Sequence, residues 1–170
     1  MSVRKLRVLA TKDQQQHVGS QPARRRASML YVIAMLLALV GLADALYLTI
    51  NHLTGQNARC TITGGCGEVL GSAYSSVGGV PVAAIGALAY FTVFSLATLA
   101  LFGYTRAQML LSLIVGLMFL TTLWLLFVQA FILHKYCEYC LLSAAITFGL
   151  TGIVIALKFV RSGEDRKRRA

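Results

Sequence analysis

The sequence His134-Lys135-Tyr136-Cys137-Glu138-Tyr139-Cys140 lies where one long apolar run ends and the next begins. Two thiols separated by two residues in the first turn of a helix lie on one side of it, close enough to form a disulfide. The positive end of the helix dipole and the nearby Lys135 favour the thiolate, which is the nucleophilic form of cysteine. Because both flanking runs are long enough to cross a membrane, the sequence predicts a redox centre at the edge of a bilayer.

The composition is typical of a membrane protein, because 57% of the 170 residues are apolar and only 13% are charged. All Lys and Arg residues except Arg59 and Lys135 lie towards the two ends of the chain or in the short connection that holds Arg106. Cytoplasmic segments of membrane proteins are rich in Lys and Arg, so we expect both termini in the cytoplasm. The basic charge therefore indicates topology and contact with lipid, and we expect no nucleic-acid partner.

Four apolar runs predict an all-α integral membrane protein, a four-helix transmembrane bundle within a membrane domain at residues 29–160. The first run has 22 residues, which at ~1.5 Å per residue cross the ~30 Å hydrocarbon core and are too many for a cleaved signal peptide. We expect a disordered basic tail at 1–28 and a basic tail at 161–170. The predicted spans are residues 29–50, 80–102, 109–133 and 139–157.

The connection at residues 51–79 is long, polar and rich in Gly, Ser and Thr, and it holds Cys60 and Cys66. Between Cys66 and Tyr74 the pattern suits a short helix lying along the membrane surface. With a cytoplasmic N-terminus, four spans place this loop and the Cys137 region on the outer face. We therefore expect every cysteine on the extracytoplasmic side of the plasma membrane, where disulfides persist.

Four cysteines allow three pairings, and their spacing does not choose among them. Structural disulfides would make the protein a non-catalytic, disulfide-braced membrane protein, although a C-x-x-C pair at a helix start braces little. The spacing of Cys60 and Cys66 does not suit a zinc knuckle, so we expect no metal. A redox relay uses all four cysteines: a flexible loop carries Cys60 and Cys66 to a fixed pair, and electrons pass through mixed disulfides.

Three features together resemble the vitamin K epoxide reductase family in its short bacterial form. They are Cys60-x5-Cys66, Ser72 six residues beyond Cys66, and Cys137-Glu138-Tyr139-Cys140 opening the last helix. The resemblance covers residues 30–160. The order of the pairs distinguishes it from the disulfide-bond protein B family, whose C-x-x-C pair lies in the first external loop.

This resemblance implies an oxidoreductase that acts on protein dithiols and passes the electrons to a membrane quinone, either menaquinone or ubiquinone. Cys60 and Cys66 would oxidise a thioredoxin-like protein, which we expect to be a separate extracytoplasmic protein because no such domain follows the fourth span. Cys137 would receive electrons from the loop, and Cys140 would face the quinone.

The resemblance also implies a quinone pocket in which the Ser72 hydroxyl binds a quinone oxygen and Tyr74 helps to close the site. Leu125, Gln129 and Leu133 recur every four residues and share a face leading to Cys137, a pattern that ordinary helix packing also produces. The expected wall consists of Leu70, Ser72, Tyr74, Leu125, Gln129, Leu133 and Tyr139.

Two departures bear on the alternative function, reduction of a quinone or vitamin K epoxide with thiols only as the electron source. Animal enzymes of the family have a tyrosine and an asparagine where this chain has Ala144 and Val82, which argues against epoxide reduction. Asp44 lies inside the first predicted span, where an ionisable group costs ~2.5–3.5 kcal/mol. It is either a proton relay to the reduced quinone or a neutral carboxyl hydrogen-bonded between helices or to water.

Overall fold

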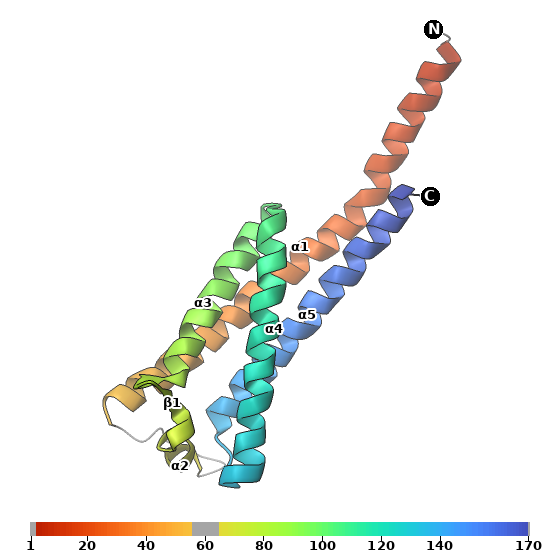
Figure 1. Ribbon diagram of the computed structural model, residues 1–170. Helices are drawn as coiled ribbons and strands as arrows, with labels where there is room; N and C mark the ends of the chain where they lie inside the picture. The colour runs from red at the N-terminus through yellow and green to blue at the C-terminus, as the bar shows by residue number, and fades with distance from the viewer. Residues whose placement is uncertain (1–2, 56–64, 170) are drawn as a thin grey trace.

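The computed structural model describes residues 3–55 and 65–169, and the side chains of residues 25–55, 65–72 and 74–163. This part of the chain is almost entirely helical (Figure 1). In order, its elements are α1 (Val3–Leu53), α2 (Cys66–Leu70), the 3-10 turn η1 (Ala73–Ser75), strands β1 (Ser76–Val77) and β2 (Val80–Pro81), α3 (Val82–Leu101), α4 (Thr105–Phe127), the π-helical segment η2 (Val128–Leu133) and α5 (Glu138–Arg169).

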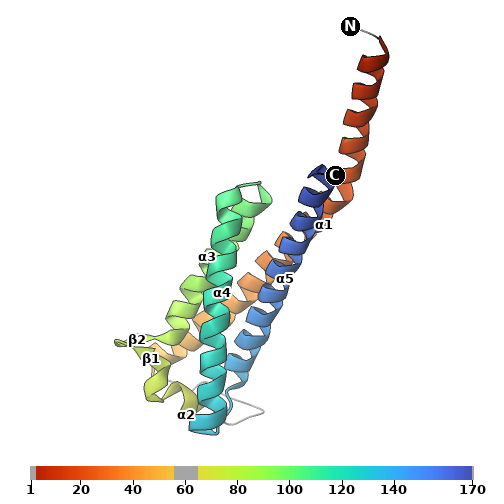
Figure 2. The same cartoon turned by 45° about the vertical axis from the view of Figure 1, so that its right-hand side comes forward.

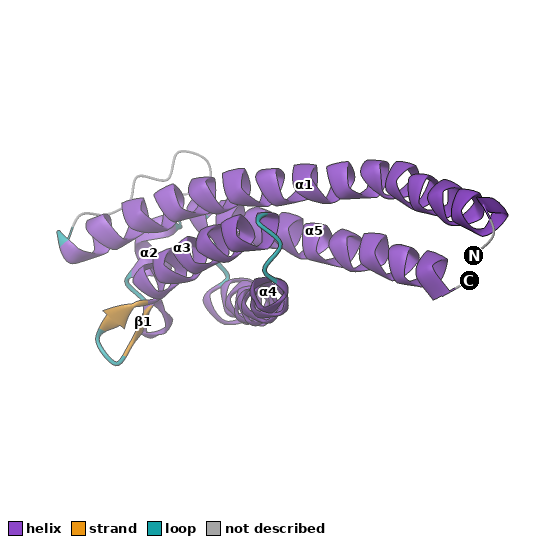
Figure 3. Ribbon diagram, turned by 90° about the horizontal axis from the view of Figure 1, so that it is seen from above, coloured by secondary structure: helices purple, strands orange, loops and turns teal. Residues whose placement is uncertain are grey.

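The four long helices pack as a closed ring, in which α1 contacts α3 and α5, and α4 contacts the same two helices (Figure 3). In the described part of the chain, four segments are long and apolar enough to cross a membrane. The predicted four-helix transmembrane bundle is therefore confirmed, and the protein is an integral membrane protein. The four segments are Arg25–Leu53, Val82–Leu101, Thr105–Leu133 and Glu138–Gly163.

Small side chains form much of the bundle interior, whereas many large apolar side chains, such as Phe91, Met109 and Leu120, face outwards. Small residues allow helices in a membrane to approach closely, and outward apolar groups suit contact with lipid. At Gly41 on α1, an added Cβ would lie 2.5 Å from the ring of Tyr90 on α3, so this crossing requires glycine. Buried alanines recur in the core at Ala34, Ala38, Ala45, Ala87, Ala97 and Ala100.

The helices extend beyond the predicted spans. The tail that we expected to be disordered at residues 1–28 is helical from Val3 onwards, and α5 continues through the predicted tail to Arg169. Once a membrane helix has formed, adding residues to its end costs no new nucleation, which explains how polar segments without apolar periodicity become helical. Pro81, expected inside the second span, instead precedes α3 with extended φ and ψ angles of −59° and 133°.

All of the described cysteines lie at one end of the bundle (Figure 1). The start of α1, the end of α5 and the α3–α4 connection point to the opposite end, while α2, the β1–β2 hairpin and the start of α5 gather here (Figure 2). The hairpin turns at Gly78 and Gly79, whose φ angles of 60° and 82° suit a two-residue turn. It directs the chain from the short helix α2 into α3.

Candidate redox site

Gln129 holds the segment that leads to the C-x-x-C pair. The chain leaves the π-helical turn η2 at His134, which adopts a left-handed conformation with φ of 52°. The backbone N–H of Lys135 then donates to the Gln129 carbonyl at 3.2 Å, and the N–H of Cys137 donates to the Gln129 side-chain Oε1 at 3.1 Å. One residue thus fixes both the turn and the position of Cys137.

Cys137 acts as the N-cap of α5, because its Sγ accepts a hydrogen bond from the Cys140 backbone N–H at 3.4 Å. The hydrogen bond from the Cys140 side chain is the main cause that lowers the pKa of Cys137, from 9.0 to about 7; burial opposes it, and the backbone N–H groups of Tyr139 and Cys140 contribute. Lys135, which we expected to favour this thiolate, pairs its ammonium group with Glu68, at 3.2 Å.

The helix α2 brings Cys66 against Cys137. Both residues are fully buried, and their Sγ atoms lie 3.5 Å apart. Gly65 makes this approach possible, because an added Cβ there would lie 2.7 Å from the Tyr136 carbonyl oxygen. The ion pair between Glu68 and Lys135 bridges the same two segments.

The described cysteines differ in oxidation state. Cys66 is disulfide-bonded, whereas Cys137 and Cys140 are free thiols. Cys60, the other residue of the predicted loop pair, lies outside the described residues. A disulfide sulfur next to a free thiol is the arrangement that thiol–disulfide exchange requires.

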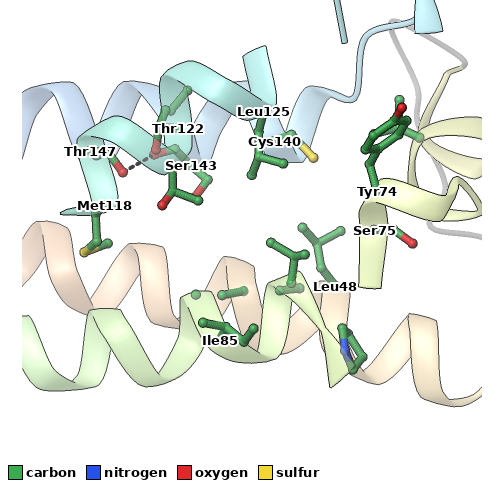
Figure 4. A pocket seen from close by; sticks show the side chains of 18 of the residues that line it. Leu48, Tyr74, Ser75, Ile85, Met118, Thr122, Leu125, Cys140, Ser143 and Thr147 are labelled. Carbon is green, nitrogen blue, oxygen red and sulfur yellow. Dashed lines mark hydrogen bonds between the residues drawn. The ribbon is translucent and has the colours of Figure 1, made fainter. Parts of the chain in front are cut away.

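A cavity of about 350 Å³ lies between the helices, next to Cys140 (Figure 4). Cys140 lines this cavity and Cys137 does not, so the two cysteines of the pair have different neighbours. Most of the predicted pocket wall lies here, namely Leu70, Ser72, Tyr74, Leu125, Gln129 and Leu133. Ser72 already uses its hydroxyl proton, which it donates to the Val69 carbonyl at 2.7 Å.

Tyr139 does not line the cavity. Its ring lies 5.1 Å from that of Tyr47 on α1, and it packs against the buried cluster that contains Cys66 and Cys137. Successive helical residues are rotated by ~100°, so Tyr139 points away from the direction that Cys140 takes into the cavity. The structure therefore does not place Tyr139, which we expected in the wall, among the residues that line this cavity.

A polar cluster in the cavity wall was not found from the sequence. The Tyr90 hydroxyl lies within hydrogen-bond distance of the Ser143 carbonyl, the Ser143 Oγ and the Thr147 Oγ1, at 3.0, 2.8 and 3.2 Å. The available signal was the spacing of Cys140, Ser143 and Thr147, which places all three on one helix face. Asp44 also lines the cavity; its side chain is 8% exposed, and its Oδ2 has no hydrogen-bond partner.

Among the described side chains, no group of three or more His, Cys, Asp or Glu residues is arranged to hold a metal ion. The described cysteines instead form a thiol–disulfide centre next to an apolar cavity.

The bundle and its cysteines define a membrane protein built for thiol–disulfide exchange. Residues 32–155 match the vitamin K epoxide reductase family, and the chain belongs to this family, as its motifs predicted. It is also similar to the thiol-disulfide oxidoreductase LTO1 of Arabidopsis thaliana, with 34% identity over 125 residues. The match covers 63% of this chain but only 31% of that relative.

Proposed function

We propose that this protein is a quinone-dependent thiol oxidoreductase that forms disulfides in a separate extracytoplasmic thioredoxin-like protein. One observation carries the proposal: Cys137 lies 3.5 Å from Cys66, while Cys140 lines the cavity. The pair can therefore exchange with the loop on one side and face a small molecule on the other. The similarity to a thiol-disulfide oxidoreductase supports the same chemistry.

The exchange proceeds between sulfur atoms that are already close. The Cys66 thiolate attacks the Cys137 sulfur of a Cys137–Cys140 disulfide, which forms a Cys66–Cys137 bond and releases the Cys140 thiolate. Cys60 then attacks Cys66, closes the loop disulfide and releases Cys137. The loop pair is oxidised and the C-x-x-C pair is reduced by two electrons. A disulfide at Cys66 with free thiols at Cys137 and Cys140 is the state that follows this exchange.

The cavity residues fit a quinone. The cavity volume of about 350 Å³ falls within the ~300–1,000 Å³ typical of small-molecule pockets. The cavity wall is mostly apolar, with a few polar groups. Leu125, Leu133 and Ile85 would hold the ring, and Gln129 offers its amide NH₂ because Cys137 already occupies its Oε1. A quinone bound there accepts two electrons and two protons.

The two departures from epoxide-reducing enzymes lie in this same cavity. Val82 and Ala144 both line it, and neither supplies a hydroxyl or an amide to an epoxide oxygen. This favours quinone reduction coupled to protein oxidation over epoxide reduction.

Charge supports an orientation with the cysteines outside the cytoplasm. Arg25 lies in α1 just before its apolar part, Arg106 in the first turn of α4 and Arg161 in the C-terminal part of α5. These parts of the helices lie away from the end of the bundle that holds α2 and the start of α5 (Figure 1). The end of a membrane bundle that is rich in Lys and Arg usually faces the cytoplasm. Both termini would then be cytoplasmic, and the cysteines would meet an extracytoplasmic partner.

An anaerobic assay tests the proposal. The purified protein in lipid nanodiscs is mixed with a reduced thioredoxin and a short-chain ubiquinone or menaquinone analogue, and the quinone absorbance is followed. We expect thiol-dependent quinone reduction, which falls to the uncatalysed rate in Cys140→Ala. Thr92→Val, which removes a hydroxyl that is hydrogen-bonded within α3, serves as the control and should reduce quinone at the wild-type rate. Bound quinone without thiol-dependent reduction would refute the proposal.

A further inference from the structure

Asp44 carries an unsatisfied polar atom in the interior of the bundle. It lies within the membrane span Arg25–Leu53, and only 8% of its surface is exposed. Its Oδ2 is shielded and has no hydrogen-bond partner. Leaving a buried polar group unpaired is energetically costly, so such a group calls for an explanation such as a ligand that pairs with it.

The unpaired carboxyl belongs to the same cavity as Cys140. Asp44, Leu48 and His52 follow one another at four-residue intervals on α1, and all three line the cavity. Thus one face of α1 forms a wall of the cavity that runs from the buried carboxyl towards the end of the helix. In Figure 4, Leu48 of this face lies across the cavity from the α5 residues Cys140, Ser143 and Thr147.

The other polar groups in this part of the wall already have partners. The hydroxyl groups of Tyr90, Ser143 and Thr147 lie within hydrogen-bond distance of one another or of backbone carbonyls. The titratable residues that line the cavity are Asp44 and His52 from α1, Tyr74 from η1, Tyr90 from α3 and Cys140 from α5, and α4 contributes none. Asp44 is the carboxylic acid among them.

We infer that Asp44 donates a proton to an oxygen of the quinone that the Cys137–Cys140 pair reduces. This inference rests on the proposed function and assigns one more catalytic residue to the same site. No cationic side chain pairs with Asp44 among the described residues. Burying a charged carboxylate without a partner is costly, so Asp44 enters the reaction as the acid.

Proton balance explains why an acid is needed. Because the pKa of Cys137 lies at about 7, a large part of the reduced protein at neutral pH holds one thiolate and one thiol. Oxidation of this pair to a disulfide releases two electrons and one proton, whereas conversion of a quinone to a hydroquinone takes up two electrons and two protons. Asp44 supplies the second proton, becomes a carboxylate and regains a proton from water.

Infrared difference spectroscopy tests the contact without turnover. A short-chain ubiquinone analogue is added to the oxidised protein, and the carboxylic C=O stretching band is compared in the wild type and in Asp44→Asn. We expect quinone binding to shift a carboxylic acid band of the wild type to lower frequency, and we expect no such band in Asp44→Asn. A shift that persists in Asp44→Asn, or no shift in a wild type that binds quinone, would overturn the inference.

Single-turnover kinetics test the proton transfer. General acid catalysis contributes ~10²–10⁴-fold, so Asp44→Asn should slow quinone reduction by the pre-reduced pair by about 100-fold. Exchange between Cys66 and Cys137 should continue, which shows that the variant is folded. Thr98→Val is the control and should leave the rate unchanged. It removes a partly buried hydroxyl outside the cavity that is hydrogen-bonded to the Phe94 carbonyl and to the Met35 sulfur.

The outcomes separate the two proposals. If the wild type binds quinone but does not reduce it, the proposed function fails. If the wild type reduces quinone and Asp44→Asn does so equally fast, only the role of Asp44 fails.

Discussion

The Sγ atom of Cys66 lies 3.5 Å from that of Cys137, although the two residues are 71 positions apart in the chain. Both side chains are completely buried, at the contact between α2 and the start of α5. Cys140, three residues further on, instead lines the cavity between the helices. Cys137 therefore contacts the loop cysteine and Cys140 faces the cavity, so substitutions can affect the Cys66 contact and the cavity wall separately.

Cys137 should titrate near neutral pH. In a chain with Cys60→Ser and Cys66→Ser, we expect thiolate ultraviolet absorbance to appear as the pH rises through about 7, because the hydrogen bond from Cys140 lowers the pKa of Cys137 from 9.0. Cys140→Ala removes this bond and should move the transition to higher pH. The same chain with Cys137→Ser provides the baseline. A transition near pH 9 before Cys140 is replaced would contradict the assignment.

Gln129 should stabilise the Cys137 segment through its side-chain oxygen. Gln129→Met leaves the Cys137 N–H without its acceptor, so the free energy of unfolding should fall by ~1–3 kcal/mol and exchange with Cys66 should slow. Gln108→Met is the matched control in the same membrane span, because the Gln108 Oε1 has no partner to lose. Unfolding in lipid bicelles measures the difference, and equal effects of the two variants would exclude this role.

The Glu68–Lys135 pair should hold α2 against the Cys137 segment. Both side chains are about half exposed, and such pairs contribute ~0.2–1 kcal/mol, so Glu68→Lys or Lys135→Glu alone should slow disulfide formation between Cys66 and Cys137 up to about fivefold. The double exchange restores an attractive pair and should recover most of the rate. The loss should shrink at high salt. A double variant as slow as the single variants would rule out the pairing.

Apolar length and cysteine spacing were sufficient to predict the fold and the family. A run of about 20 apolar residues has few alternatives to a membrane helix, and the four predicted spans correspond, with small shifts at their ends, to the four segments that are long and apolar enough to cross a membrane. The four-residue spacing of Leu125, Gln129 and Leu133 likewise placed these residues on one face, and all three line the cavity.

Contacts between distant segments could not be predicted in this way. The pairing of Lys135 with Glu68, and the unpaired oxygen of Asp44, depend on how α2 and α1 pack against their neighbours. Gln129 was expected only in the pocket wall, but the π-helical turn η2 also brings its side-chain oxygen to the Cys137 N–H. A turn of this kind has no clear sequence pattern, since it is usually a single local irregularity in a helix.

The most direct test of the relay uses two variants that each keep two cysteines. Cys60→Ser with Cys140→Ser leaves Cys66 and Cys137, whereas Cys60→Ser with Cys137→Ser leaves Cys66 and Cys140. After mild oxidation in membranes, mass spectrometry of the cleaved protein measures how fast each disulfide forms. We predict rapid and nearly complete formation of the Cys66–Cys137 bond and much slower formation of Cys66–Cys140. Equal rates, or a faster Cys66–Cys140 bond, would contradict the account.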